Sequence, residues 1–377
     1  MPVYLDNAAT TPMRAEAVEA MLPFLRDRFG NPSGSHAVAR AARKALDEAR
    51  DVVAAALGGE PGEVVFTGGG TEADNLAVAG AHRLREGTVV CSAVEHHAVL
   101  HASAALGGQV APVSADGVVD LVALADLLDR SGLVSVVSVM LVNNEVGTVQ
   151  PLAEVADIVR RLAPAAVLHT DAVAAFPWLD VASLARPADL VAVSAHKFGG
   201  PKGVGALVVR RDVKVAPVLH GGGQERDRRS GTHNVAGIVA MAAAMQATVA
   251  ERAAVATRVG PLRDRLADGL LAAVSGATET GRRETKVAGN CHVSFEGVES
   301  EALLMLLDGA GVYASAGSAC ASGAVEPSHV LAAMGVPRAR SLGSLRLSLG
   351  RDTTDADIDV ALATIPPAVG NLREGGR

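Results

Sequence analysis

The chain has 377 residues, 49% of them hydrophobic, and a formal net charge of −7 at pH 7. This length allows a sizeable core and favours two domains, while the negative charge and the lack of a long Lys or Arg run argue against nucleic acid and membrane surfaces as partners. The three cysteines show no zinc-ligand spacing and the amino terminus shows no signal-peptide pattern, so we expect a soluble cytoplasmic protein.

Short Val-rich segments alternate with longer Ala-rich segments over the first two-thirds of the chain. The Ala-rich segments, of which 35–57 is typical, put Ala and Leu on one face and charged side chains on the other, as amphipathic helices do. Continuously apolar strands between helices indicate an α/β fold with a mostly parallel sheet that is covered on both faces. The expected strands are residues 63–67, 88–94, 134–142, 166–173, 189–195 and 205–210.

The last third of the chain has a different pattern. A long Ala-rich helical region at 236–273 precedes strands at 292–297 and 344–350, with a helix at 299–311 between them. This succession indicates a smaller α+β domain, with the long helical region as the hinge. The predicted division is a large domain over 13–250, a small domain over 251–377, and an amino-terminal segment, 1–12, that packs against the small domain.

A glycine turn follows the first predicted strand. The sequence GGGT at 68–71 ends in Thr71 and opens a helix. Bare N–H groups at a helix amino terminus, together with the Thr71 hydroxyl, suit a phosphate group. Glycine turns before helices are common, so a purely structural role is an equal alternative for this turn taken alone. In α/β sheets, however, ligands bind at the carboxyl ends of the strands, where this turn lies.

Two oppositely charged residues, Asp171 and Lys197, lie at the ends of neighbouring predicted strands. A buried salt bridge would explain them, but they could also bracket a pyridine ring. Asp171 would then keep the ring nitrogen protonated, and the Lys197 amine would form a Schiff base with the aldehyde of the cofactor. Ser194, His196 and Thr71 would surround its phosphate. Because the glycine turn occurs in the same chain, we favour pyridoxal 5′-phosphate (PLP) as the cofactor.

Two adjacent histidines, His96 and His97, follow the strand at 88–94. A single histidine there is most often only a satisfied polar residue, whereas a pair favours stacking on a flat ring or proton transfer. A metal site is a weak alternative, because the other histidines show no ligand spacing.

Cys320 lies among small residues in the turn SAGSACASG, at 315–323. Cys91 lies instead within an apolar strand and Cys291 at the start of one, as structural cysteines do. The small neighbours of Cys320 predict an exposed thiol on a movable loop, which suits a nucleophile that must reach a substrate and then a partner.

The chain resembles the cysteine desulfurases of the NifS/IscS type, a group of the class V aminotransferase-like PLP enzymes. The resemblance covers nearly the whole chain, and the matching segments occur in the family's order. These segments are 4–12, 30–36, 64–77, 94–100, 142–151, 169–173, 194–203, 220–235, 315–331 and 344–351. It implies the fold of PLP-dependent transferases of fold type I, which has a large domain with a mostly parallel sheet and a smaller α+β domain.

The resemblance also implies roles for single residues. L-Cysteine would be the substrate, Cys320 would take its sulfur as a persulfide, and L-alanine would be released. The persulfide would pass to sulfur-acceptor or scaffold proteins, for iron–sulfur cluster assembly or thiolation. Cys320 could also ligate a transferred cluster, and no other metal ligand is expected. The implied cofactor contacts are Lys197 as the Schiff-base lysine, Asp171 at the ring nitrogen, His96 stacked on the ring, Asn144 near the phenolic oxygen, and Gly70, Thr71, Ser194 and His196 at the phosphate. Thr232 would reach the phosphate from the other subunit of a homodimer. Arg346 would bind the substrate carboxylate, and Asn144 would also contact the substrate. His96 and Lys197 would transfer protons.

One position departs from the family's pattern. Ala174 stands where the family usually has a Gln that hydrogen-bonds the phenolic oxygen of the cofactor. A neutral hydrogen bond contributes about 0.5–1.5 kcal/mol, so its loss is expected to alter the enzyme rather than to abolish cofactor binding.

Three alternatives remain open at this stage. A selenocysteine lyase, or another class V aminotransferase-like PLP enzyme, would use many of the same groups. A nucleotide-binding module would use the glycine turn, and a degenerate scaffold would only bind partners. The last two would leave Lys197 and Cys320 without a role.

Overall fold

The computed structural model describes residues 2–316 and 327–375. Its central feature is a seven-stranded sheet in the order β2-β8-β7-β6-β5-β3-β4. Strands β3 to β7 pair in parallel, whereas β8 is antiparallel to both of its neighbours, β2 and β7. The predicted mostly parallel sheet is therefore confirmed. The bounds are β2 Val64–Thr67, β3 Thr88–Ser92, β4 Gln109–Ala111, β5 Val134–Ser138, β6 Val167–Asp171, β7 Leu190–Ser194 and β8 Gly205–Val209.

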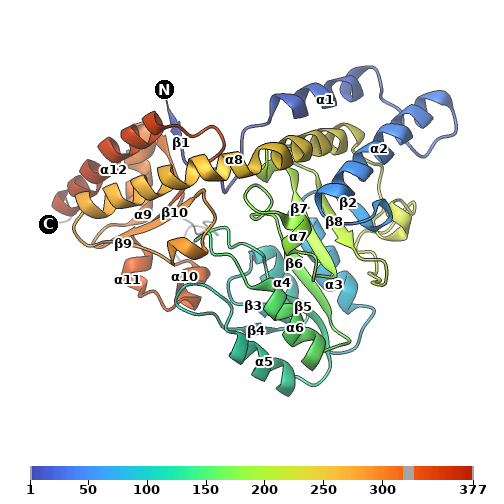
Figure 1. Cartoon of the computed structure of the whole chain (residues 1–377), viewed down its shortest axis with the longest axis horizontal. Helices are drawn as coiled ribbons and strands as arrows, with labels where there is room; N and C mark the ends of the chain where they lie inside the picture. The colour runs from blue at the N-terminus through green and yellow to red at the C-terminus, as the bar shows by residue number, and fades with distance from the viewer. Residues whose placement is uncertain (1, 317–326, 376–377) are drawn as a thin grey trace.

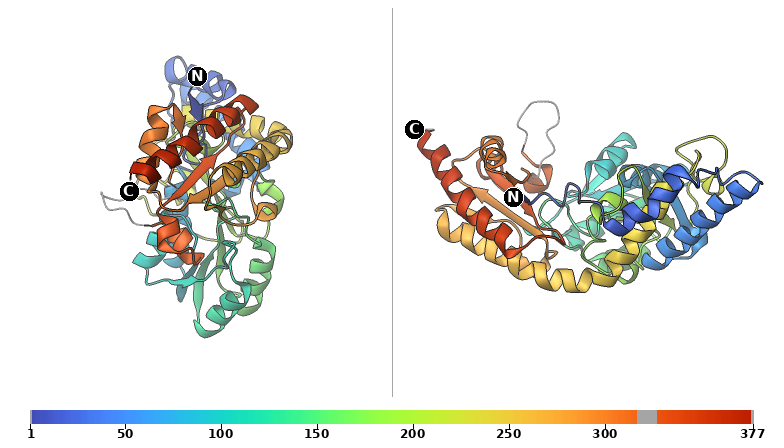
Figure 2. Two further views of the ribbon diagram at one scale, coloured as in Figure 1. Left: turned by 90° about the vertical axis from the view of Figure 1, so that its left-hand side faces the viewer. Right: turned by 90° about the horizontal axis from the view of Figure 1, so that it is seen from above.

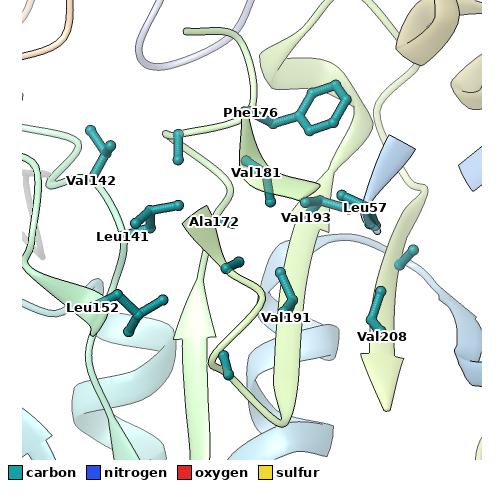
Figure 3. Packing of buried hydrophobic residues seen from close by; sticks show 14 of the residues in the cluster. Leu57, Leu141, Val142, Leu152, Ala172, Phe176, Val181, Val191, Val193 and Val208 are labelled. Carbon is teal, nitrogen blue, oxygen red and sulfur yellow. The ribbon is translucent and has the colours of Figure 1, made fainter. Parts of the chain in front are cut away.

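Helices cover both faces of this sheet (Figure 1). Val191 and Val193 of β7 point into one hydrophobic cluster, and Leu190 and Ala192 of the same strand belong to another. Successive side chains of a strand alternate between faces, so β7 is buried on both. Figure 3 shows the first cluster around Val191, Val193 and Phe176. The helices of this part are α1 Ala15–Arg26, α2 Ala37–Ala56, α3 Gly70–His82, α4 His97–Ala105, α5 Leu121–Arg130, α6 Leu152–Leu162 and α7 Val181–Leu184.

A separate hydrophobic cluster lies around a smaller antiparallel sheet in the order β12-β10-β9. The two-residue strand β1 pairs in parallel with β11, and Val3 and Leu5 are buried in this second cluster. The strands are β1 Val3–Tyr4, β9 Ala277–Glu279, β10 Asn290–Phe295, β11 Val312–Tyr313 and β12 Ser344–Ser348. The helices are α9 Ser300–Gly309, α10 His329–Ala333, α11 Arg338–Ser341 and α12 Asp355–Gly375.

Helix α8, Val235–Ala273, connects the two parts as one continuous element (Figure 1). Met241 and Met245 belong to the core of the large sheet, whereas Leu266 and Leu270 belong to the core of the small one. Figure 2 shows α12 lying along the carboxyl-terminal half of α8. By length and composition α8 could cross a membrane, but its packing into two cores is that of a core helix in a soluble protein. The predicted domain boundary near residue 250 lies within this helix and stays a prediction.

Several predicted boundaries differ from the structure. The strand expected at 134–142 ends at Ser138, and the strand expected at 292–297 is β10, Asn290–Phe295. Residues 139–142 are as deeply buried as β5 itself, so their hydrophobicity does not mark where the strand ends. The backbone of this segment still contacts β6, since the N–H of Leu141 donates to the carbonyl of Asp171 at 2.9 Å.

Candidate active site

Asp171 and Lys197 are brought together at the carboxyl ends of two adjacent strands. Asp171 is the last residue of β6, and Lys197 ends the short turn Ala195–Lys197 that follows β7. Burial raises the pKa of Asp171 to about 6, although the Lys197 ammonium opposes this shift. Burial, and next the cationic Arg346, lower the pKa of the Lys197 amine to about 8. Shifts of this kind at strand ends are typical of active sites.

The amino-terminal segment crosses directly over Lys197. The Lys197 Nζ donates hydrogen bonds to the carbonyl of Ala8 and, at 2.9 Å, to that of Ala9. Thr11 fastens the segment further, because its hydroxyl donates to the carbonyl of His196 and accepts from the N–H of Gly199, both at 2.9 Å. The sequence motif at 4–12 therefore has a physical role, which is to hold the lysine side chain between the two parts of the molecule.

The glycine turn forms one wall of a cavity beside these residues. Gly69 has φ +147°, a conformation that favours glycine, and a Cβ at this position would meet nothing nearer than Ser194 Oγ at 3.9 Å. Helix α3 begins at the next residue, Gly70, so its free N–H groups open onto the cavity. Thr71, Ser194 and His196 line the same cavity. Helix N–H groups, hydroxyls and an imidazole around open space fit a phosphate group.

His96 is the residue that caps α4. Its Nδ1 accepts a hydrogen bond from the N–H of Ala98 at 3.1 Å, so a neutral ring carries its proton on Nε2. Burial, and next the charge of Lys197, lower the pKa of His96 to about 4. The ring is therefore neutral at pH 7 and lies within electrostatic range of the lysine amine. Its stacking on a cofactor stays a prediction.

Arg346 reaches this region from β12 of the smaller sheet. Its Nη2 donates to Asp6 Oδ1 at 2.9 Å and its Nη1 to the carbonyl of Asn144 at 3.2 Å, while its buried Nε has no partner among the described residues. A guanidinium with a spare donor can bind a carboxylate. The pair between Asp6 and Arg346 was not foreseen, because residues 340 positions apart give no local signal.

Cys320 lies outside the described residues, but the chain on either side of it is fixed near the site. On one side, Ser315 pairs with Arg346, whose N–H donates to the Ser315 carbonyl at 2.7 Å. On the other, the Ser328 hydroxyl donates to the buried Glu145 carboxylate, and His329 Nε2 lies 2.9 Å from the carbonyl oxygen of Glu95. The segment that carries the cysteine therefore leaves and rejoins the described chain beside the predicted site.

Thr232 and Ala174 are two further positions that the sequence singled out, and they lie in different places. Thr232 is exposed and does not line the cavity of the glycine turn, so its expected role in a second subunit stays a prediction. Ala174 lines a second cavity, which lies between the two parts of the chain and is also lined by Asn144 and Lys197.

Among residues 2–316 and 327–375, no group of three or more His, Cys, Asp or Glu side chains could hold a metal ion.

Comparison with known proteins identifies the family. Residues 3–361 match the model of the family Aminotransferase class-V. An IscS-like cysteine desulfurase of Mycobacterium tuberculosis is 46% identical, with 98% of this chain and 97% of that protein covered. A solved NifS-like protein is 37% identical with a TM-score of 0.91, over 98% of this chain and all of that one. Another solved structure, SspA in complex with cysteine, is 30% identical with a TM-score of 0.77, over 93% and 100%.

The chain therefore belongs to the class V aminotransferases, enzymes that depend on PLP. Within this class it belongs to the cysteine desulfurases, and its fold is the one that NifS-like proteins share. The predicted family, fold class and enzyme class are confirmed.

Proposed function

We propose that this chain removes the sulfur of L-cysteine with PLP held by Lys197, leaving L-alanine and a persulfide on Cys320. The observation that carries this proposal is that Lys197, with a pKa of about 8, and Asp171, with a pKa of about 6, lie together at adjacent strand ends. Beside them is a helix amino terminus suited to a phosphate group. The membership in the cysteine desulfurases gives the substrate class.

The residues present fit the cofactor. Asp171 would hold the proton of the ring nitrogen, and the neutral His96 would stack on the ring. The phosphate would lie against Gly70 and Thr71 of α3, and Ser194 and His196 of the same chain would contact it. Thr232 would reach it from a second copy in a homodimer. When bound, PLP draws electron density from the α-carbon of the amino acid attached to it.

The side chains of the protein would then act on the substrate in turn. Arg346 orients the substrate carboxylate, and Asn144 lies beside it. Lys197, whose amine is half deprotonated near pH 8, accepts the α-proton. The Cys320 thiolate forms a bond with the substrate sulfur while the carbon–sulfur bond breaks, and the electron pair stays with carbon. Protonation at that carbon, and return of the α-proton from Lys197, complete L-alanine. The substrate sulfur is thereby oxidised and its carbon reduced without an external oxidant.

The persulfide would be delivered to sulfur-acceptor or scaffold proteins of the cytoplasm, for iron–sulfur cluster assembly or thiolation. Such transfer is a thiol exchange, which requires that Cys320 reach a second protein. The described chain on either side of its segment is held beside the site, at Ser315 and at Ser328.

Two variants test this proposal. Purified wild-type protein should release L-alanine from L-cysteine and form a protein persulfide. Cys320→Ser should keep the visible absorbance of the cofactor and lose the persulfide, whereas Lys197→Ala should lose both. Cys91→Ala is the matched control, because burial raises the pKa of that thiol to about 12 and leaves it unreactive. Desulfuration by Cys320→Ser at the wild-type rate would contradict the proposal.

A further inference from the structure

A line of buried polar side chains lies behind Asp171. His169 and Asp171 are two residues apart on β6, so their side chains leave the same face of the sheet. His169 Nδ1 lies 2.8 Å from Ser138 Oγ of β5, and His169 Nε2 lies 3.5 Å from Asp74 Oδ1 of α3. The side chains of His169 and Asp74 are 0% and 2% exposed. Within the described part of the chain, neither His169 Nε2 nor Asp74 Oδ1 has a hydrogen-bond partner, so their 3.5 Å approach is a close polar contact between two buried groups.

Asp74, Glu95 and Asp171 are three buried carboxylic acids of this region, and the Lys197 ammonium acts on Asp171. Burial, and next the charges of Asp171 and Glu95, raise the pKa of Asp74 well above its ordinary value. Burial likewise raises the pKa of Glu95 to about 8. His169 cannot supply a balancing charge, because burial lowers its pKa to about 3. With Lys197 as the neighbouring cation, adjacent buried carboxylates cannot all ionise.

The hydrogen bonds indicate which acid keeps its charge. Asp171 accepts the N–H of Val173 at 2.8 Å and lies within range of the Lys197 ammonium, and both interactions favour its anion. Among the described residues, the group that faces Asp74 Oδ1 is the uncharged imidazole of His169. Both tautomers of a neutral His169 are satisfied by a protonated Asp74, since the acid can accept from Nε2–H or donate to a bare Nε2.

We propose that Asp74 is a positioning residue, which stays a neutral acid paired with His169 so that the negative charge remains on Asp171, where the ring nitrogen of PLP would bind. This inference rests on the proposed function, because it assigns the charge that faces the cofactor. The uncharged pair fills the space behind Asp171 and keeps its carboxylate directed at the cofactor site.

Infrared spectroscopy tests the protonation directly. Asp74→Asn replaces the acid by a neutral group of the same shape. At neutral pH, the difference spectrum between the wild-type and Asp74→Asn chains should show the loss of a protonated carboxylic-acid band. Asp157→Asn, at an exposed position of α6, is the matched control and should remove carboxylate bands only. Loss of carboxylate bands alone in Asp74→Asn would overturn the inference.

Cofactor retention tests the positioning role. Asp74→Asn should release PLP on dialysis at the wild-type rate, whereas Asp74→Ala, which removes the polar group that faces His169 Nε2, should release it at least tenfold faster. If Asp74→Ala retained PLP as well as the wild-type chain, or if Asp74→Asn lost PLP tenfold faster, Asp74 would not be a positioning residue. A wild-type chain that binds no PLP would refute the proposed function instead, and the infrared measurement on the cofactor-free chain would still decide the protonation of Asp74.

Discussion

Glu225 should stabilise the folded chain more than any exposed ion pair. Its carboxylate accepts hydrogen bonds from both Nη atoms of Arg50, at 2.6 and 2.8 Å, from the N–H of Phe66 at 2.9 Å, and pairs with His233 Nε2 at 2.7 Å. Glu225 and the two residues after it all have positive φ, of 51°, 57° and 62°. Such strain persists only where surrounding contacts enforce it.

Two routes give the size of the effect. Removal of one partner of a buried ion pair costs about 3–5 kcal/mol, because the other charge stays buried and unpaired. The contacts with Arg50 and His233 lower the pKa of Glu225 from 4.5 to about 2 despite its burial. At about 1.4 kcal/mol per pKa unit, that difference corresponds to about 3 kcal/mol. Glu225→Ala should therefore lower the free energy of unfolding by about 3–5 kcal/mol.

The pH dependence has a definite sign. A carboxylate whose folded pKa is depressed stabilises the protein above its unfolded pKa and loses this contribution as the pH falls through the folded value. The difference between the wild-type chain and Glu225→Ala should thus be full above pH 4.5 and shrink toward pH 2.

Urea unfolding of the cofactor-free chain measures this difference, with fluorescence of Trp178, which contacts both hydrophobic cores. Glu48→Ala is the matched control, since the Lys44–Glu48 pair spans 3.6 Å with side chains 78% and 66% exposed. It should cost at most about 0.5 kcal/mol. A loss below about 1 kcal/mol in Glu225→Ala, similar to that of the control, would refute the reasoning.

Three further outcomes concern the site. The rate of PLP loading onto the cofactor-free chain should rise about tenfold per pH unit up to pH 8 and then level off, because the neutral Lys197 amine is the nucleophile. Arg346→Gln should move the pH at which the rate levels off upward, because Arg346 lowers the pKa of Lys197. An unchanged pH would contradict that effect of Arg346. Arg346→Lys should raise KM for L-cysteine about tenfold or more, since a charged hydrogen bond contributes about 1.5–3 kcal/mol; an unchanged KM would remove Arg346 from substrate binding. Ala174→Gln should shift the visible absorbance of the bound cofactor, and an identical spectrum would mean that another donor serves the phenolic oxygen.

The strands of the large sheet could be predicted because both of their faces are buried. Val191 and Leu190 pack on opposite sides of β7, so its first four positions are all apolar and its type is clear from sequence. Its ends are less clear, as residues 139–142 show. The meeting of Asp171 with Lys197 was also predictable, because the carboxyl ends of parallel strands share one edge of the sheet.

Contacts between distant segments could not be predicted. Asp6 reaches Arg346 just after the two-residue strand β1, which pairs with β11, and Asp6 itself bridges to Ser348 of β12. A two-residue strand carries no periodic signal. The spacing of His169 and Asp171 placed both on one face of a strand, but nothing local indicated that Asp74 of α3 would cover it. The left-handed turn at Glu225 was equally hidden, because it contains no glycine and depends on Arg50 from α2.

The attachment of PLP to Lys197 is the central claim, and borohydride reduction tests it most directly. Reduction fixes a Schiff base as a stable secondary amine, and mass spectrometry of the digested protein then locates the modified lysine. We expect the pyridoxyl group on the peptide that contains Lys197, with the other lysines unmodified. A pyridoxyl group on a different lysine, or an unmodified Lys197 in protein that retains its visible colour, would contradict the assignment.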